Sequence, residues 1–462
     1  MGSEPSERVP ERLVWIYGLP GLGFGFLFFL TSVYLMKYAT DVLLVPPAVI
    51  GGLFLASRVW DAVSDPLAGH LSDRTRSRLG RRRPWMLASA LPVAATALMV
   101  WCPPPYLEGA GLAVWMGVAL LGHFSATTLF AVPHESLGAE LARDHHDRTR
   151  LFGIRHVLHT FGIFAALAGI FLLVRSEAPR ETAFRLIATA GALTAALTLL
   201  AVALLREPPE HQGRGGQRPF AAFADVLRNP HARLLLVVFA IETIGTATLG
   251  ILLPYVLEYV VGRPDLIPQL IAVYMVPAVL FVPLWIALSR RLGKKPLWTG
   301  SMGAMTVAFS ALFFVGPGDW LYVAVLALLA GVGGGCGAVV APSIQADIID
   351  WDELQTGERK EGAYFAVWSF VRKAAFGLTA GATGIALAAT GFVPNAEQGP
   401  DTLLAMRSLF GLFPGACYLV GTLLFLRFRF TQAEHRAVLS ALATRRAAAG
   451  GESASSRRRA CR

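Results

Sequence analysis

SRVWDAVSDPLAGHLSDRTRSRLGRRRPW, residues 57–85, begins within an apolar stretch long enough to span a bilayer yet carries charges in its middle. Asp61 and Asp65 are four residues apart, so on a helix they lie one turn apart on one face, with Arg58 on a neighbouring part of that face. Charged side chains inside a membrane normally point into a helix bundle or a wet cavity, so the pattern predicts a cation site. A charge cluster used only for packing is the alternative, and two carboxylates against one arginine disfavour it.

The whole chain has the composition of a membrane protein. Its 462 residues are 54% hydrophobic and 16% charged, and its mean hydropathy is +0.53. Apolar stretches of spanning length, about 20 residues each, recur twelve times. They lie near 14–38, 46–71, 84–102, 110–137, 152–174, 183–205, 232–261, 266–289, 296–315, 320–343, 362–391 and 402–428. The sequence therefore predicts an all-α polytopic membrane protein with twelve transmembrane helices.

The distribution of basic residues predicts how the chain is oriented. Arginines and lysines crowd the loops that follow even-numbered stretches, beginning with six arginines between Arg74 and Arg83, whereas the opposite loops hold only three. Because such residues stay on the cytoplasmic side, both termini are expected in the cytoplasm. The same rule explains the net charge of +10 without a nucleic-acid partner.

An internal repeat predicts two halves. RLGRRRPW (78–85) follows the second apolar stretch of the first half, and the similar RLGKKPLW (291–298) follows the second apolar stretch of the second half. Two parallel six-helix repeats are typical of the major facilitator architecture, with the solute near the membrane midplane. The predicted boundaries are a cytoplasmic N-terminus (1–13), a first half (14–205), a central linker (206–231), a second half (232–428) and a basic tail (429–462).

Three long motifs resemble one family, the glycoside–pentoside–hexuronide:cation symporters. They are the stretch quoted above, VPHESLGAELARDHHDRTRLFGIRH (132–156) and DIIDWDELQTGERKEGAYFAVWSFVRKAAFGL (347–378). The resemblance covers nearly the whole chain and implies the major facilitator fold and secondary symport. It places six residues at functional positions of the family: Asp61, Asp65 and Thr128 at the cation, Arg58 before the carboxylates, Lys373 facing them, and Arg155 at the sugar.

The sequence also departs from the sugar site of one well-known member of that family. Acidic residues that grip the sugar in the first and fourth helices are replaced here by the stretch Gly23-Phe24-Gly25 and by Ala131, and a stacking aromatic aligns near Glu135. A pocket that hydrogen-bonds sugar hydroxyls depends on such groups. The family's sugar specificity is therefore not expected to transfer unchanged.

The carboxylate pair suits either of two ions. Sodium prefers several oxygen ligands, which Asp61 and Asp65 offer beside a hydroxyl, whereas a proton needs one carboxylate. Lys373 is expected to hold the pair while no cation is bound and to release it when one arrives, linking ion and solute occupancy. A lysine snorkelling to the surface is the alternative.

Other polar residues are candidates for the transport path. His134 and Glu135, after Pro133, either replace the missing acid or carry a proton in the charge network, or else form a helix-end pair bonded to the basic loop. Glu242 is a candidate for solute binding from the second half. The run Gly331–Gly337 indicates close helix packing or a flexing helix rather than a phosphate loop.

A cytoplasmic gate is predicted where acidic and basic residues alternate. It comprises Asp73, Arg74, Asp347 and Asp350, which are expected to exchange partners between conformations. The four cysteines lack metal or redox spacing, and no nucleotide, zinc or catalytic-triad motif is present. The sequence thus predicts a monomeric, cofactor-free symporter of the cell's inner or plasma membrane, which moves a small solute, most simply a sugar, with Na⁺ or H⁺. Transport of an amphipathic solute, cation-independent transport and a membrane sensor are the alternatives.

Overall fold

The computed structural model describes residues 9–141, 145–207, 226–357, 361–431, 433–442 and 444, and this part of the chain is helical with connecting turns. The N-terminal half comprises α1 (Glu11–Gly18), α2 (Pro20–Val33), α3 (Leu35–Asp41), α4 (Pro47–Arg74), α5 (Arg83–Trp101), α6 (Gly109–Leu141), α7 (His145–Val174) and α8 (Pro179–Leu204). Helices α1 to α3 follow one another directly and occupy the first predicted stretch. Most of the predicted linker, 208–225, lies outside the described residues, as do 1–8 and 445–462.

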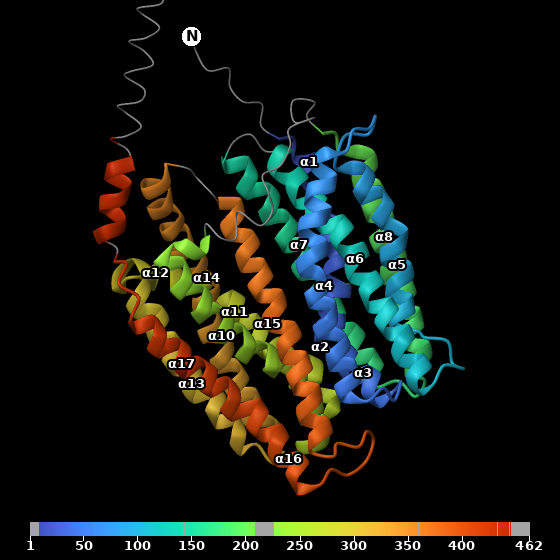
Figure 1. Ribbon diagram of the computed structural model, residues 1–462. Coiled ribbons are helices and arrows are strands. Elements are labelled where there is room, and N and C mark those ends of the chain that lie inside the picture. The colour runs from blue at the N-terminus through green and yellow to red at the C-terminus, as the bar shows by residue number, and fades with distance from the viewer. Residues whose placement is uncertain are drawn as a thin grey trace, which may run out of the picture.

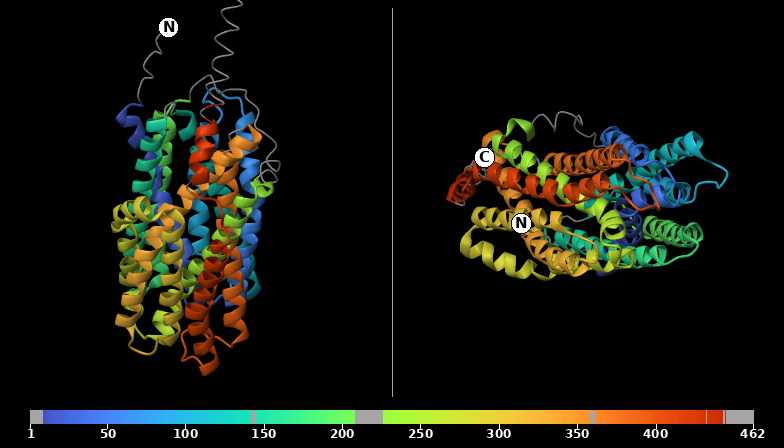
Figure 2. Two further views of the ribbon diagram at one scale, coloured as in Figure 1. Left: turned by 90° about the vertical axis from the view of Figure 1, so that its left-hand side faces the viewer. Right: turned by 90° about the horizontal axis from the view of Figure 1, so that it is seen from below.

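The C-terminal half is helical as well. It comprises α10 (Pro230–Tyr255), the π turn η2 (Val256–Val260), η3 (Pro264–Leu266), α11 (Ile267–Leu280), α12 (Val282–Leu292), α13 (Lys294–Ala311), η4 (Leu312–Phe314), α14 (Trp320–Thr356), α15 (Glu361–Ala389), α16 (Pro400–Arg407), η5 (Ser408–Leu412) and α17 (Phe413–Leu426). The α11 segment, together with η3, and α12 meet at a bend of 47°. In Figure 1 the two halves form two groups of long, roughly parallel helices, and Figure 2 shows the same helices from a second side and from below.

Nine helical segments of the described chain are long and apolar enough to cross a membrane, and the bent pair Pro264–Leu280 and Val282–Leu292 adds a tenth. Helices α4 and α15 are not among them, although they are 28 and 29 residues long. Both carry charges, Arg58, Asp61 and Asp65 on α4 and Arg372 and Lys373 on α15. Charge lowers the apolar character of a helix, and α4 and α15, the two helices that fail this test, form the most extensive helix contact between the halves.

Close packing of α4 against α15 depends on glycine. A Cβ on Gly51 would stand 2.5 Å from the carbonyl oxygen of Ala380, and one on Gly384 would stand 2.2 Å from that of Pro47. Neither distance leaves room for a side chain. In the second half, a Cβ on Gly331 would come within 2.2 Å of the carbonyl oxygen of Tyr274. The close packing predicted for the Gly331–Gly337 run is therefore confirmed.

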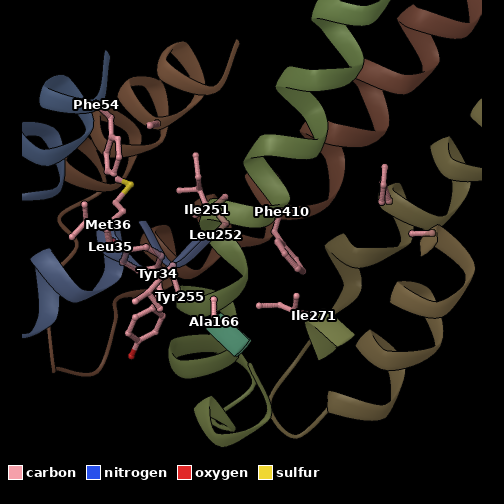
Figure 3. Packing of buried hydrophobic residues seen from close by; sticks show 14 of the residues in the cluster. Tyr34, Leu35, Met36, Phe54, Ala166, Ile251, Leu252, Tyr255, Ile271 and Phe410 are labelled. Atoms are coloured by element: carbon pink, nitrogen blue, oxygen red, sulfur yellow. The ribbon is translucent and has the colours of Figure 1, made fainter. Parts of the chain in front are cut away.

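The two halves share one apolar core at the end where α3 ends. Figure 3 shows Leu35 and Met36 of the first half near Ile251, Leu252 and other residues of the second. These side chains are buried. We call the opposite end, where α4 ends and α5 begins, the basic end, and the described end of the N-terminal segment also lies there (Figure 1).

A polar cluster, which we call the clasp, joins the halves beside this shared core. It comprises Lys37, Thr40 and Asp41 of α3 with Tyr255, Glu258, Tyr259 and Asn395 of the second half. Lys37 is buried, forms an ion pair with Asp41 and lies 2.6 Å from a Glu258 oxygen. Tyr259 donates a hydrogen bond to Asp41 at 2.6 Å. The clasp therefore adds charged contacts to the apolar seal between the halves.

Candidate cation and solute site

Helix α4 places the predicted carboxylates at the contact between the halves. Asp61 is buried, whereas the side chain of Asp65 keeps 29% of its exposure. The difference follows from helical spacing, since one turn separates the two residues along α4. The more accessible Asp65 is the one that an ion from solvent reaches first.

Arg58 is held by Asp61 and by aromatic rings. One guanidinium nitrogen lies 2.9 Å from Asp61 Oδ2, and the guanidinium carbon lies 4.0 Å from the ring centre of Phe124 and 5.2 Å from that of Phe376. These contacts compensate part of the cost of burying the cation. Arg58 therefore balances the charge of Asp61 and is held in one orientation.

Lys373 crosses from α15 to the same site. Its ammonium group forms an ion pair with Asp65 and lies 3.7 Å from Asp61 Oδ2. Thr128 of α6 donates a hydrogen bond of 2.8 Å to Asp65 Oδ1. The structure thus brings together Arg58, Asp61, Asp65, Thr128 and Lys373. The two carboxylates already face two cationic side chains, Arg58 and Lys373. A further cation therefore keeps the site neutral only if one of these side chains moves away.

The donor set suits a monovalent ion. It offers four carboxylate oxygens and one neutral hydroxyl, and Asp61 Oδ1 lacks a hydrogen-bond partner among the described residues. Those residues contain no group of three or more His, Cys, Asp or Glu side chains that could hold a metal ion. Two carboxylates with neutral oxygens match the oxygen ligands that Na⁺ takes, and either carboxylate can accept a proton.

The predicted pair His134 and Glu135 is divided between two environments. Glu135 is exposed and forms an ion pair of 2.9 Å with Arg155 of α7. His134 is buried, stacks between the rings of Tyr17 and Phe130, and its Nε2 lies 2.9 Å from the carbonyl oxygen of Tyr17. Its contacts are thus aromatic and backbone groups, whereas Glu135 and Arg155 form a separate charged pair.

At Gly23 and Gly25 the first helix leaves no space for the acidic side chain that the sequence lacks. A Cβ on Gly23 would stand 2.1 Å from the hydroxyl of Thr194, and one on Gly25 would stand 2.1 Å from the carbonyl oxygen of His159. Both glycines are in contact with neighbouring helices. The departure noted in the sequence therefore has a structural reason, because this part of α2 is used for packing.

Glu242 lines a cavity of about 500 Å³ that lies wholly within the C-terminal half. Helices α10, α11, α13, α14, α15 and α17 enclose it, and we call it the polar chamber. Gln345 of α14 and Arg372 of α15 line it as well, and sequence reasoning missed both. A polar residue in the apolar helix α14, and an arginine directly before Lys373, were the available signals.

Among the predicted gate residues, Asp73 and Asp347 form ion pairs within their own halves. Asp73 forms an ion pair with Arg82 and lies 3.8 Å from Arg81. Arg74 is exposed. Asp347 lies 2.5 Å from Lys294, and its carboxylate is 3.5 Å from His435 Nδ1. His435 Nε2 also contacts Asp350 at 3.1 Å, so the start of the tail is attached to α14.

Comparison with known proteins now identifies the family. Residues 16–432 match the family model described as MFS/sugar transport protein. The chain belongs to this family. An uncharacterised symporter, YjmB of Bacillus subtilis (strain 168), is 25% identical over 95% of this chain and 96% of its own length. A glucuronide carrier protein homolog of Escherichia coli (strain K12) is 26% identical over 88% of this chain and 90% of its own.

Two further similarities extend the comparison. The sodium-dependent lysophosphatidylcholine symporter 1 of Xenopus tropicalis is 23% identical over 91% of this chain and 86% of its own length. The crystal structure of the nucleoside transporter NupG matches with a TM-score of 0.67 at 14% identity, covering 91% of this chain and all of that one. The family and these structural neighbours are membrane transporters of the major facilitator type, not enzymes, and several relatives are named symporters.

Proposed function

We propose that this protein is a secondary active symporter that moves a small hydroxylated solute of the sugar or glycoside class with Na⁺ or H⁺ by alternating access. The family membership and the named glycoside and sugar symporters among its relatives support this class of cargo. In this proposal α4 and α15 complete twelve spans, the basic end faces the cytoplasm with both termini, and the monomer lies in the cell's inner or plasma membrane.

The observation that carries the proposal is the contact of Lys373 with the carboxylates of the other half. Lys373 belongs to the C-terminal half, whereas Asp61 and Asp65 belong to the N-terminal half. Na⁺ bound between the carboxylates, or a proton on Asp65, takes the place of the lysine ammonium because the site holds two negative charges. Lys373 is then released, and the ion thereby changes a contact between the moving halves.

Coupling to the solute follows from the position of Lys373 on α15. The preceding residue, Arg372, lines the polar chamber, and Ser369 one turn earlier does so too. A solute in the chamber therefore acts on the same helix that closes the ion site. Coupled binding is reciprocal. If the ion raises the affinity for the solute by some factor, the solute must raise the affinity for the ion by the same factor.

The remaining charged pairs have proposed roles in the path. Arg155, with Glu135, presents a guanidinium for solute hydroxyls on the N-terminal side, and His134 orders this region through Tyr17. Asp73, Arg74, Asp347 and Asp350 form a gate at the basic end. The ion pairs that Asp73 and Asp347 form within their own halves exchange for pairs between the halves when that end closes.

Uptake into proteoliposomes tests this function. We would impose a Na⁺ or a proton gradient, offer labelled sugars, methyl glycosides and uronides, and compare the wild type with Asp61→Asn, Lys373→Ala and the control Arg185→Ala. Arg185 is exposed and pairs only with nearby Glu181 among the described contacts. Uptake that follows one gradient, and is lost in Asp61→Asn but kept in the control, is the expected result.

Other outcomes would overturn parts of the proposal. Full cation coupling in Lys373→Ala would refute the exchange at Asp65. Uptake independent of both gradients would establish a uniporter or exporter, and solute binding without flux would establish a sensor.

A further inference from the structure

Two buried polar atoms in the polar chamber lack partners. Glu242 and Gln345 are both more than nine-tenths buried, and neither Oε1 of Glu242 nor Nε2 of Gln345 has a hydrogen-bond partner among the described residues. Leaving such groups unpaired costs free energy, so they are seldom orphaned without a reason. One is an acceptor and the other a donor. A hydroxyl-rich ligand can satisfy both, because each hydroxyl donates and accepts.

The other walls of the chamber fit the same head group. Trp298, Trp368, Tyr418, Ser301 and Ser369 line it, and the Ser301 hydroxyl, which donates to the Gly333 carbonyl oxygen at 2.8 Å, can still accept a hydrogen bond. Aromatic faces pack against the C–H surface of a sugar ring, and the hydroxyls extend its polar contacts. The volume of about 500 Å³ lies within the usual range of small-molecule sites.

A second cavity, which we call the apolar crevice, adjoins the chamber. Its volume is about 260 Å³, and Thr246 and Tyr274 line both spaces. The crevice lies farther along α10, toward the end of the molecule that contains the clasp (the clasp end). Leu249 and Leu253 line it, and almost all its other lining residues are apolar. Two of them, Ile271 and Phe410, appear among the buried core residues in Figure 3.

The shared lining residues Thr246 and Tyr274 place the two cavities side by side, which indicates what occupies the crevice. A compact sugar in the chamber would leave the crevice empty, whereas an apolar group attached to that sugar enters it past Thr246 and Tyr274. We propose that the preferred solute is an amphiphilic glycoside, whose hydroxylated head occupies the polar chamber and whose apolar aglycone occupies the apolar crevice. The inference rests on the proposed transport function and specifies its substrate.

Gly250 provides a selective test because it lines the crevice and a Cβ there meets no atom within 4 Å. Gly250→Leu therefore fills the crevice without a clash at Cβ. Gly300→Leu is the matched control, since Gly300 is an exposed helical glycine of the same half, lines neither cavity and also has open space at Cβ. Glu242→Gln alters the chamber alone.

The measurement is inhibition of labelled methyl glycoside uptake in proteoliposomes by unlabelled methyl and n-hexyl glycosides of one sugar. Burial of the extra methylenes should lower the concentration of the hexyl compound that gives half-maximal inhibition by at least about tenfold, relative to the methyl compound. Gly250→Leu should abolish this advantage, whereas Gly300→Leu should keep both the advantage and the uptake of the methyl glycoside. Glu242→Gln should weaken inhibition by both compounds by a similar factor.

The outcomes separate the two proposals. If no sugar or methyl glycoside is transported, the proposed function itself fails. If methyl glycosides are transported and the hexyl compound has no advantage, or keeps it in Gly250→Leu, the crevice assignment is wrong. The protein could instead take up lysophosphatidylcholine and no glycoside, and lose that uptake in Gly250→Leu. That result would overturn the sugar head group and show that the chamber binds a phospholipid head group.

Discussion

Removing the charge of Lys37 should open the clasp end. Lys37 forms an ion pair with Asp41 of its own half, lies 2.6 Å from Glu258 of the other, and lies 5.3 Å and 4.7 Å from the ring centres of Tyr255 and Tyr259. Only the contacts with the second half are lost when the halves part. Lys37→Met keeps much of the side-chain volume and deletes those charged contacts.

The magnitude follows from the burial of the two partners. The Lys37 side chain is 3% exposed but that of Glu258 is 31% exposed, so their attraction is partly screened by solvent. A charged hydrogen bond of this kind contributes about 1–2 kcal/mol after that discount, which shifts a two-state equilibrium by about 5- to 30-fold. The fraction of molecules open at the clasp end should rise by that factor.

The assay is a distance distribution between spin labels across the clasp end. Tyr106 of the first half and Phe314 of the second are 80% and 74% exposed, so cysteines at these positions, in a background without the native cysteines, accept labels. Lys37→Met should increase the population at long distance. Glu258→Gln is the matched variant because it removes the same cross-half pair while leaving Lys37 with Asp41. Unchanged distributions in both folded variants would refute the clasp as a charged seal.

Three further predictions follow from individual contacts. Thr128→Val should raise the cation concentration that half-activates uptake by about tenfold, because a hydrogen bond to a charged carboxylate is lost. Thr128→Ser should keep the wild-type value, and equal activation curves for the two variants would contradict this prediction. His435→Ala should make the chain near residue 435 more sensitive to limited proteolysis, because its contacts with α14 are removed; unchanged cleavage would argue against that attachment. Gly331→Ala should lower the unfolding temperature, with a cost of about 1–3 kcal/mol, because its Cβ would meet the carbonyl oxygen of Tyr274 at 2.2 Å. Gly337→Ala, whose Cβ would stand 3.5 Å from its nearest neighbour, should not; equal melting curves would count against the tight α11–α14 contact.

Much of the fold could be predicted because membrane insertion imposes local rules. The length of each apolar stretch, the charge of each loop and the spacing of Asp61 and Asp65 are all readable over one or two helical turns. The helical segments agree with the predicted stretches. The contacts of Thr128 and Lys373 with the carboxylates, in contrast, were predicted only from the resemblance to a family. The twelve spans and the cytoplasmic termini stay predictions.

The sequence by itself determined that the chain is helical and membrane-spanning and that its second apolar stretch carries two carboxylates on one face, and its repeated basic motif predicts two related halves. Only the tertiary structure decided which groups those carboxylates meet, since Lys373 lies 308 residues beyond Asp65. It also decided that Glu242 and Gln345 share a chamber and that Lys37 joins the halves. The physical reason is that membrane helices are apolar on most faces, so helical periodicity gives little information about which helix packs against which.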